Sequence, residues 1–398
     1  TDRAQTEKPA IARIADKVAA WFVFIILLIA TAIAYWWWQH DPQHAFAITL
    51  SVLVVTCPCA LSLATPVAIT AATGALTRTG LLTTRGHVLE TMARASHIVF
   101  DKTGTLTEGN LELHAVNLLG DMDREAVLQL AALLESRSEH PVAKVLTHAV
   151  KQLPSDLIDS YIATPGRGIE AVIKGEIYRI GNLDFVAELA GKPQLADSGN
   201  NATVVGMCQG KQWLATFELN DRIREQARQV IQQLKTAGLS VSLLSGDARQ
   251  AVEYTARELG IEHFAFSQSP EDKLNEIRRL QANGEIVAMV GDGVNDAPVL
   301  SGADVSLAMG SGTQLAHASA DMVLLSEQLK HLLTGLLMAR KTVRIIKQNL
   351  AWALTYNLLA LPLAASGMIA PWMAALGMST SSLVVVVNAL RLKNTDHL

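Results

Sequence analysis

The chain has 398 residues, of which 50% are hydrophobic and 18% charged, and its formal net charge is −4. This length allows several domains, and a small net charge without blocks of like charge argues against a nucleic-acid partner. Its 3 cysteines have no regular spacing. They do not suggest a disulfide framework, so we expect a reducing compartment for the soluble part.

Long uncharged runs near both ends of the chain predict four membrane helices. Ala19–Trp38 is long enough to cross a bilayer, and Ala45–Thr77 contains no Asp, Glu, Lys or Arg. Leu350–Leu390 is also uncharged but too long for one span, so its prolines and glycines are expected to divide it. The expected helices lie at about residues 18–38, 46–73, 349–365 and 371–390, on either side of a polar block of roughly 260 residues.

Basic residues predict the orientation of these helices. Lys and Arg occur beside the polar block and near both termini, whereas the connections Gln39–His44 and Ser366–Ala370 contain neither. By the positive-inside rule, we expect both termini and the polar block on the cytoplasmic side. The aromatic cluster Tyr35–Trp38 would then anchor the first helix at the outer interface.

Three apolar segments of the polar block each lead directly into a polar loop. They are His97–Phe100 before Asp101–Thr107, Val241–Leu244 before Ser245–Asp247, and Ile286–Val290 before Gly291–Pro298. Helical stretches are expected between them at Arg222–Ala237 and Pro270–Asn283. This alternation predicts a doubly wound parallel sheet, which binds its ligands at the carboxyl ends of its strands.

These loops carry the groups that phosphoryl transfer requires. Asp101 is a candidate nucleophile, and Ser245 and Gly246 can hold a phosphate through a hydroxyl and backbone amides. Asp292 and Asp296 can remain ionised together around a hard cation, which indicates Mg²⁺. The chemistry that fits is phosphoryl transfer to an aspartate, although any one of these acids can also be a cap or turn residue.

The motifs DKTGTLT at Asp101–Thr107 and GDGVNDAP at Gly291–Pro298, with SGD between them, resemble the phosphorylation domain of P-type ATPases. This domain is a branch of the haloacid dehalogenase superfamily. Asp221–Arg224 resembles the family's DxxR element, where the chain re-enters this domain. Ser245 departs slightly from the family, which usually has Thr there, but the hydroxyl is kept.

The resemblance implies a role for each motif residue. The expected catalytic residues are Asp101, Lys102, Thr103, Ser245, Gly246, Asp247, Lys273 and Asn295. The expected Mg²⁺ site consists of Asp101, Thr103, Asp292 and Asp296. Asp101 would be phosphorylated, Thr103 would bind Mg²⁺ through its carbonyl, and Lys273 can place a positive charge on the phosphoryl oxygens.

An insertion at roughly 111–215 separates the first two loops. Its expected elements are helices Arg124–Glu135 and Val142–Gln152 and strands Glu170–Ile173, Tyr178–Ile180 and Thr203–Cys208. Three of its motifs resemble the nucleotide-binding domain of heavy-metal P-type ATPases, namely Glu135–Pro141, Gly166–Ile169 and Gly181-Asn182. Cys208 has no partner in the sequence and is expected to be a buried, inert thiol.

Seven residues of these motifs are the expected ATP-binding residues. They are Glu135, His140, Gly166, Gly168, Ile169, Gly181 and Asn182. The glycines Gly166 and Gly168 permit a close approach of the backbone to the nucleotide. His140 can stack or form a hydrogen bond, and Glu135 can accept one from an adenine amino group. The Ser-Glu-His-Pro stretch alone would equally suit an ordinary helix start.

The second membrane helix contains Cys57-Pro58-Cys59. Pro58 removes a helical hydrogen bond and frees the carbonyl near Val54, a break tolerated where it is packed against protein or lines a cavity. In a regular helix the two cysteines would point to nearly opposite faces, and unwinding at Pro58 lets both sulfurs turn toward one ion. The alternative is a simple kink with two small side chains.

The other polar residues of the spans favour a soft ion. No acid or base occurs between Leu350 and Leu390, and a divalent ion would require a nearby carboxylate. Two thiolates and a thioether suit Cu(I) or Ag(I). CPC, Tyr-Asn and Met-x-x-x-Ser resemble the copper-transporting group of type IB P-type ATPases. The segments Ala60–Val67 and Thr84–Glu90 resemble the subgroup tied to cytochrome oxidase maturation.

This resemblance implies an intramembrane ion site. Its expected residues are Cys57, Cys59, Tyr356, Asn357, Met378 and Ser382. Asp16 resembles the family's entry carboxylate, or is an ordinary solvated charge.

Together these patterns predict an α-helical membrane protein with inserted α/β cytoplasmic domains. A haloacid-dehalogenase-like doubly wound parallel sheet (96–110 and 216–331) carries an α+β nucleotide-binding insertion (111–215). Membrane helices and stalks occupy 1–95 and 332–398. The family's actuator domain, earlier membrane helices and soluble metal-binding domain do not occur in this sequence. We therefore expect a later part of a pump that cannot turn over alone.

The main functional hypothesis is ATP-driven export of Cu(I) through an aspartyl-phosphate, with Mg²⁺ as cofactor and membrane lipid and a cytoplasmic copper chaperone as partners. A Zn²⁺ or Cd²⁺ exporter of the same mechanism is the alternative. A membrane-tethered phosphatase with a redox-active CPC pair belongs to a different class, as does a binding scaffold. Both leave some motifs without a use.

Overall fold

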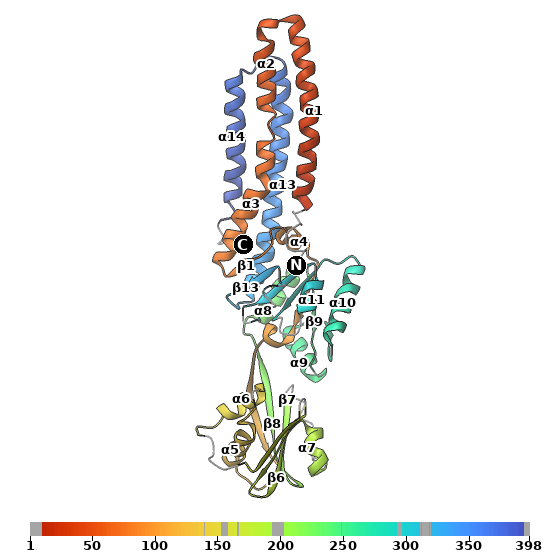
Figure 1. The fold of residues 1–398 in the computed structure, drawn as a ribbon, viewed down its shortest axis with the longest axis vertical. Coiled ribbons are helices and arrows are strands. Elements are labelled where there is room, and N and C mark those ends of the chain that lie inside the picture. The colour runs from red at the N-terminus through yellow and green to blue at the C-terminus, as the bar shows by residue number, and fades with distance from the viewer. Residues whose placement is uncertain are drawn as a thin grey trace. The chain divides into compact units, whose positions relative to one another are not determined.

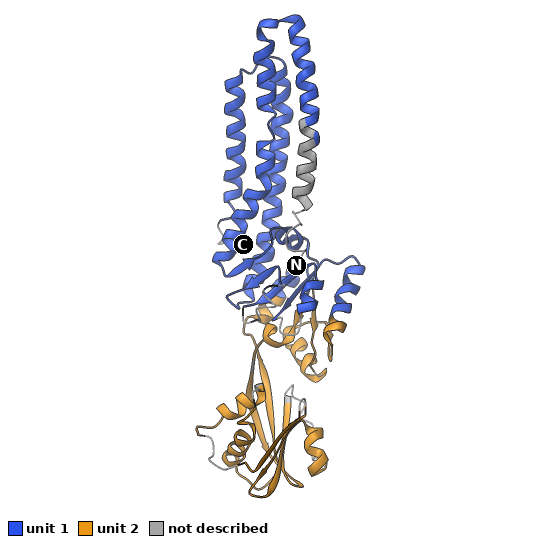
Figure 2. Ribbon diagram, viewed as in Figure 1, with its two compact units in different colours: residues 1–99, 232–240, 274–398 blue, residues 100–231, 241–273 orange. Residues whose placement is uncertain are grey.

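The computed structural model describes residues 10–138, 140–152, 158–164, 167–192, 203–247, 249–292, 297–310, 312, 318 and 320–393. Three predicted site residues, Gly166, Asn295 and Asp296, lie outside these ranges, as does the side chain of Asp16. The chain divides into two compact units (Figure 2). One comprises residues 1–99, 232–240 and 274–398, and the other comprises residues 100–231 and 241–273.

Long helices of the first unit occupy the predicted membrane-spanning positions and lie side by side (Figure 1). They are α1 (Ala10–His40), α2 (Pro42–Val55), α3 (Cys59–Arg78), α13 (Lys330–Ala365) and α14 (Pro371–Leu390). Among the described residues, Pro42–Arg78 and Pro371–Leu390 are long and apolar enough to cross a membrane, and Phe24–His40 is a shorter apolar helix. The predicted division of the last apolar run is confirmed, because α13 ends at Ala365 and α14 begins at Pro371.

Small residues line the contacts between these helices, and large apolar residues point outward. Alanines such as Ala64 and Ala364 are fully buried, whereas Phe46 and Leu358 are more than 70% exposed. An exposed apolar surface of this extent suits lipid better than water. The indole of Trp37 donates a 3.0 Å hydrogen bond to the carbonyl of Ala365, which ties α1 to the end of α13.

The chain also forms a seven-stranded sheet, in which the order of the strands is β1-β13-β12-β11-β2-β9-β10. Its strands are β1 (Leu81–Thr83), β2 (His97–Asp101), β9 (Ser240–Leu244), β10 (His263–Ala265), β11 (Val287–Gly291), β12 (Val305–Met309) and β13 (Met322–Leu324). The pairs β9–β10, β11–β12 and β12–β13 are parallel. The three predicted strands are therefore present, and the sheet is mainly parallel as expected.

The segment after the second span contains β1, which pairs antiparallel with β13, and the short helix α4 (Val88–Arg94). One local expectation about this region is wrong. The helix expected to begin at Arg222 begins at Ala227 as α8 (Ala227–Thr236), because Asp221 and Ile223 still pair with β3. The other helices beside the sheet are α9 (Arg249–Leu259), α10 (Pro270–Ala282) and α11 (Ala297–Gly302).

The second unit contains a six-stranded antiparallel sheet in the order β3-β8-β7-β6-β5-β4. Its strands are β3 (Thr107–Leu118), β4 (Ser160–Thr164), β5 (Gly168–Ile173), β6 (Glu176–Gly181), β7 (Thr203–Gln209) and β8 (Gln212–Ile223). Helices α5 (Arg124–Glu135), α6 (Pro141–His148) and α7 (Leu183–Ala190) accompany it. Burial alternates along β5, and its inward residues Ile169, Ala171 and Ile173 join the core beneath α5 and α6. The helix expected at Val142–Gln152 is shorter than predicted, because α6 ends at His148.

Candidate functional site

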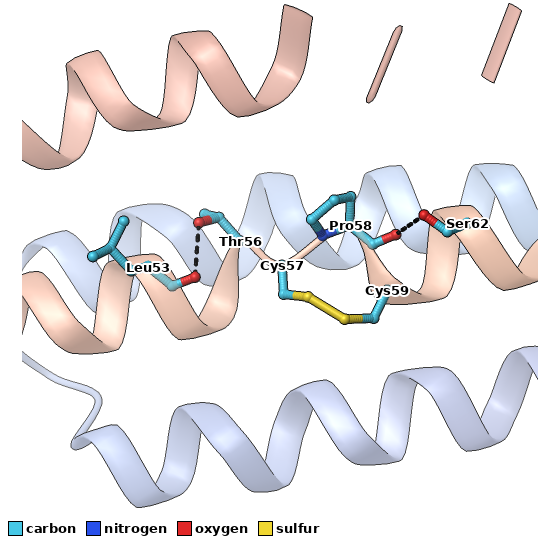
Figure 3. The surroundings of a disulfide bond; sticks show 6 residues. All are labelled: Leu53, Thr56, Cys57, Pro58, Cys59 and Ser62. Carbon is cyan, nitrogen blue, oxygen red and sulfur yellow. Dashed lines mark hydrogen bonds between the residues drawn. A yellow bond between two sulfur atoms is a disulfide. The ribbon is translucent and has the colours of Figure 1, made fainter. Parts of the chain in front are cut away.

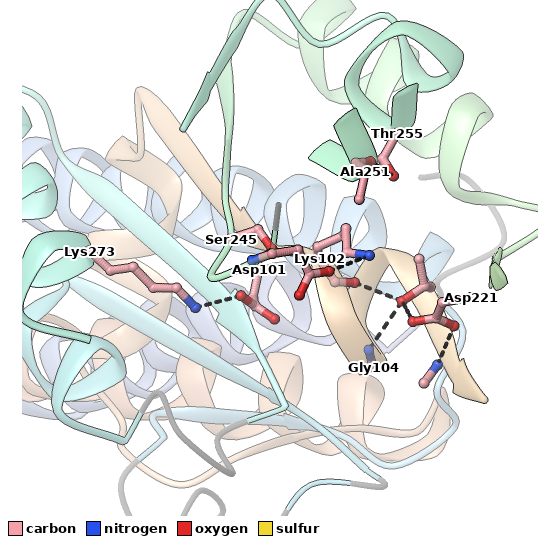
Figure 4. A network of polar contacts seen from close by, with 11 residues as sticks. Asp101, Lys102, Gly104, Asp221, Ser245, Ala251, Thr255 and Lys273 are labelled. Carbon is pink, nitrogen blue, oxygen red and sulfur yellow. Dashed lines mark hydrogen bonds and ion pairs between the residues drawn. The ribbon is translucent and has the colours of Figure 1, made fainter. Parts of the chain in front are cut away.

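Asp101 is the last residue of β2, a strand that is buried along its whole length. Lys273, in the first turn of α10, donates a 2.6 Å hydrogen bond from Nζ to Oδ1 of Asp101 (Figure 4). Each residue is only 6% exposed. The structure thus brings together the predicted nucleophile and the predicted phosphate-binding lysine as a desolvated ion pair.

The loop after β9 reaches the same place. Nζ of Lys102 lies 2.5 Å from Oδ2 of Asp247, and the backbone N–H of Asp247 donates to the hydroxyl of Ser245. Ser245 is buried, and its carbonyl accepts from the N–H of Gln268. The first two predicted loops, including Gly246 between Ser245 and Asp247, therefore converge.

Asp221 supports the irregular turn 102–106 that follows Asp101. The hydroxyl of Thr107 donates a 2.5 Å hydrogen bond to Oδ2 of Asp221, and the N–H of Gly109 donates to its other oxygen. Burial raises the pKa of Asp221 above its usual range, although Thr107 and the charge of Lys102 act in the opposite direction.

Arg224 supports the same turn from the end of β8. Its guanidinium donates to the carbonyls of Thr105, Thr107 and Gly104. Gly104 has a φ of +70°, which a residue with a side chain rarely adopts. The sequence indicated the Asp221–Arg224 element by resemblance alone. The structure shows that both residues position the turn after the nucleophile.

The third predicted loop is described only in part. Asp292 directly follows β11, while Asn295 and Asp296 belong to the segment outside the described ranges. The described residues contain no group of three or more His, Cys, Asp or Glu side chains that could hold a metal ion. Thr103 is exposed on the turn and has an extended backbone.

A cavity of about 370 Å³ opens beside the six-stranded sheet. It is lined by Glu135, Ser138, His140, Val142, Ala163, Thr164, Arg167, Gly168, Ile169, Gly181, Asn182, Val204 and Val205. Every predicted nucleotide-binding residue that the structure describes is in this set. The sequence interpretation missed the β4 and β7 residues of the wall, and it also missed Arg167, which stands between two glycines of a recognised motif.

Glu135 is the least solvated ionisable group of this cavity. It is 5% exposed, and its Oε2 has no hydrogen-bond partner. Burial raises its pKa to about 7, and the hydrogen bond from Ser138 opposes the shift. A buried carboxyl with an unsatisfied oxygen is suited to a hydrogen bond from a ligand.

The glycines of the cavity have a structural role that the sequence did not show. Gly168 and Gly181 face each other across β5 and β6. A Cβ on Gly168 would lie 2.3 Å from the carbonyl oxygen of Ile180, and one on Gly181 would lie 2.2 Å from that of Arg167. Gly168 was expected to allow approach to a nucleotide, but the closest groups it accommodates belong to the neighbouring strand.

Two other predicted residues act as helix caps at the cavity wall. Nδ1 of His140 accepts from the N–H of Val142 at the start of α6. The side-chain oxygen of Asn182 accepts from the N–H of Phe185 at the start of α7. These bonds fix the two side chains at the rim of the cavity.

The predicted break in the second membrane helix is confirmed (Figure 3). Helix α2 ends at Val55 and α3 begins at Cys59, with Pro58 as its N-cap. The carbonyl of Val54, expected to be freed, accepts from the N–H of Cys57 at 3.3 Å. The hydroxyl of Thr56 donates to the carbonyl of Val52. The backbone at the break is thus largely satisfied within the chain itself.

Both sulfurs turn to the same side of the break, as predicted, and they form a disulfide between Cys57 and Cys59 (Figure 3). No disulfide was expected from the three cysteines, so this bond is a correction. A bridged pair offers no thiolate, and a soft ion would need the reduced pair. Cys208 is free and buried as predicted, and burial raises its pKa.

The remaining predicted ion-site residues lie at the level of the break. Above it, Val52 and Val55 pack with Ala360, Ala364 and Ala374. Below it, Ala60, Leu61 and Ala64 pack with Ala353 and Val385. Tyr356 and Asn357 lie between these two contact regions on α13, and Met378 and Ser382 lie between them on α14. The hydroxyl of Tyr356 also lies against Gly377.

Comparison with known proteins identifies the family. Residues 95–304, more than half of the chain, match the model of haloacid dehalogenase-like hydrolases. The chain belongs to this family of hydrolases.

The chain is also similar to P-type ATPases over almost its whole length. It is 36% identical over 406 residues to cation-transporting P-type ATPase B of Mycobacterium tuberculosis, covering 99% of this chain and 54% of that protein. It is 37% identical over 405 residues to a copper-exporting P-type ATPase of Staphylococcus haemolyticus, covering 98% and 50%. Homology to heavy-metal P-type ATPases thus extends over nearly the whole chain, and the predicted resemblance is confirmed.

Solved structures agree with the expected fold class. A zinc-transporting PIB-type ATPase in its E2.Pi state has a TM-score of 0.79 and 33% identity, covering 94% of this chain and 62% of that chain. A catalytic domain of a CPx-ATPase has a TM-score of 0.57 and 28% identity, covering 66% and 98%. The fold is a helical membrane protein with inserted α/β domains. The chain spans about half the length of the relatives it matches.

Proposed function

We propose that this chain carries the phosphorylation, nucleotide-binding and ion-binding parts of an ATP-driven Cu(I) exporter. The observation that carries the proposal is the buried Asp101–Lys273 pair at the end of β2, next to the Ser245 loop. We assign phosphorylation to residues 96–110 and 216–331 and nucleotide binding to 111–215. The helices at 1–95 and 332–398 would conduct the ion.

The geometry supports nucleophilic attack by Asp101. An oxygen of its carboxylate would bond to the γ-phosphorus of ATP while the bond to the ADP oxygen breaks, giving an aspartyl-phosphate and ADP. Lys273 lies where it can neutralise phosphoryl oxygens, and the hydroxyl of Ser245 and the amide of Gly246 can hold them. Lys102, paired with Asp247, keeps a second positive charge beside the nucleophile.

The predicted loops supply oxygen donors for Mg²⁺. The proposed ligands are the carboxylates of Asp101 and Asp292 and the main-chain carbonyl of Thr103, with Asp296 and Asn295 in support. Hard oxygen ligands of this kind are those that Mg²⁺ prefers. When bound, the ion would neutralise charge on the transferring phosphoryl group.

The cavity at the six-stranded sheet suits the base of ATP. Its walls are largely apolar, and Glu135 supplies a buried carboxyl oxygen for an adenine amino group. The CPx-ATPase catalytic domain, which is similar to this chain in fold, undergoes conformational changes upon nucleotide binding.

Cu(I) is the ion that the membrane residues favour, with Ag(I) as its chemical analogue. Cys57, Cys59 and Met378 offer sulfur, and Leu350–Leu390 contains no carboxylate to balance a divalent ion. A relative from Staphylococcus haemolyticus is named as copper-exporting. The PIB-type ATPase that shares this fold is zinc-transporting, so Zn²⁺ or Cd²⁺ export remains the alternative.

The same proposal includes the cellular location and the orientation of the protein. Both termini and the α/β domains would face the cytoplasm of a bacterial inner membrane, where a cytoplasmic copper chaperone would deliver the ion. The basic residues at the inner helix ends, such as Arg78 and Arg391, support this orientation.

Metal-dependent phosphorylation of the intact protein that contains this chain tests the proposal. Labelled ATP should phosphorylate the reduced protein when Cu(I) is present, and Asp101→Asn and Cys57→Ser should abolish the label. Stimulation by Zn²⁺ but not by Cu(I) would replace copper by the alternative ion.

The disulfide between Cys57 and Cys59 favours one competing function, a membrane-tethered phosphatase with a redox pair. Phosphatase activity that survives Cys57→Ser, with no metal ion bound in the membrane, would support that function against the pump.

A further inference from the structure

Arg167 is the cationic side chain of the nucleotide cavity. It is the only Lys or Arg among the lining residues that the structure describes. Glu135 is the acidic residue of the same cavity, and its buried oxygen suits a hydrogen bond from the base. A nucleotide bound through its base at Glu135 would bring its polyphosphate toward another part of the lining.

The guanidinium of Arg167 contacts two side chains of α7. It forms an ion pair with Glu188 and lies over the ring of Phe185, 5.1 Å from the ring centroid. The side chains of Arg167 and Glu188 are 42% and 55% exposed. An ion pair this exposed contributes little to stability and can be exchanged for a stronger anion at small cost.

Glu188 would not lose its positive partner in such an exchange. Nη1 of Arg179 lies 3.7 Å from its other oxygen. Arg179 is itself fixed by Glu170, at 2.6 Å, and by the carbonyl of Phe185. It also covers the Phe185 ring, 4.7 Å from the centroid. The cluster can therefore release Arg167 and remain neutralised.

The main chain of Arg167 is fixed while its side chain is exchangeable. Its carbonyl accepts from the N–H of Asn182 at 2.8 Å, and its N–H donates to the carbonyl of Thr164 at 3.1 Å. This anchors the residue between β4 and β6 at the cavity rim. The side chain then needs only rotations about its own bonds to change partner.

We propose that Arg167 is the phosphate-binding residue of this cavity, released from Glu188 when a nucleotide di- or triphosphate binds. The planar guanidinium can form two parallel hydrogen bonds to phosphate oxygens, which are stronger than its bonds to an exposed carboxylate. The inference rests on the proposed nucleotide site, and it separates recognition of the base at Glu135 from recognition of the phosphates at Arg167.

Calorimetric titration of the full chain in detergent with adenosine, AMP, ADP and ATP tests this role. Arg167→Ala should weaken ADP and ATP about 10- to 100-fold and change adenosine less than about twofold. Arg167→Lys should keep part of the phosphate affinity. Glu188→Gln should strengthen ATP binding about two- to fivefold, because it frees the guanidinium.

The two substitutions at the ion pair therefore move ATP affinity in opposite directions. A purely structural ion pair predicts the same direction for both, and that result would overturn the proposal. Equal losses for adenosine and ATP in Arg167→Ala would also overturn it. If the unchanged chain bound none of the four ligands, the nucleotide site itself would be wrong, and this inference would fail with it.

Discussion

Lys273 and Asp101 form a buried ion pair, with Nζ and Oδ1 separated by 2.6 Å and each residue only 6% exposed. Replacing Lys273 by Met would leave the carboxylate buried without its cation. We expect a loss of about 3–5 kcal/mol in the free energy of unfolding. Phosphorylation by labelled ATP should slow by at least about 100-fold, because the positive charge that neutralises the phosphoryl oxygens in the transition state is removed.

Lys211→Met is the matched control, because Lys211 is exposed at the turn between β7 and β8. It should alter neither quantity. A Lys273→Met protein that is phosphorylated at the original rate would contradict the role assigned to the ion pair.

Replacing Arg224 should reduce stability and phosphorylation without reducing ATP affinity. Arg224→Ala removes the donors to three carbonyls of the turn after Asp101 and should cost about 1–3 kcal/mol of stability. Phosphorylation should fall while ATP affinity, measured by calorimetry, stays unchanged, because the cavity at Glu135 is not touched. Arg222→Ala, at an exposed position two residues away, is the control. Equal effects of the two substitutions would argue against a specific brace.

Gly168 and Gly175 offer a test of the cavity floor. Gly168→Ala would place a Cβ 2.3 Å from the carbonyl oxygen of Ile180 and 2.6 Å from the Cα of Gly181, so β5 and β6 must separate. ATP affinity should fall at least about tenfold, at an overpacking cost of about 1–3 kcal/mol. At Gly175, with a φ of +83°, a Cβ meets nothing within 4 Å. Gly175→Ala should therefore cost some stability and leave ATP affinity intact.

Much of this architecture could be predicted because the sequence signals were local. The apolar strand before Asp101, the uncharged spans and Pro58 each determine their own structure through burial or a missing hydrogen bond. The order of the motifs then placed Glu135 and Gly181 in one cavity.

Other features depend on partners that are distant in sequence. The pairing of β1 with β13 joins residues more than two hundred positions apart, and no local pattern indicates it. The same holds for the contact of Arg224 with the Gly104 turn. Gly168 looked like a ligand-binding glycine, yet its immediate neighbour is another strand.

Glu135 predicts a pH dependence of the stability of the six-stranded sheet. Burial raises its pKa from 4.5 to about 7. The folded state therefore binds the proton more tightly, and stability from this group is complete below about pH 4.5 and is lost as the pH rises to about 7. The loss is on the order of 3 kcal/mol. Glu135→Gln should flatten this dependence and be relatively more stable at pH 8.

Urea unfolding at pH 5 and pH 8, followed through protection of the β5–β8 amides, measures this difference. Glu176→Gln, at an exposed position of the same sheet, should retain the original dependence. An unchanged pH profile in Glu135→Gln would show that another group is responsible.

The Cys57–Cys59 bond predicts that ion binding requires reduction. The intact protein should bind Cu(I) in the membrane site after treatment with a phosphine reductant and lose it after oxidation by diamide, because a disulfide has no thiolate to donate. Alkylation followed by mass spectrometry reports the state of the pair, with two labels on the reduced pair and none on the oxidised pair.

Cys57→Ala should abolish Cu(I) binding in both states. Cys208→Ala should behave like the unchanged protein, since Cys208 is buried in a separate cluster with Val186 and Trp213. Cu(I) bound equally by the reduced and oxidised protein would exclude these sulfurs as its ligands, and the helix break would then be only a kink.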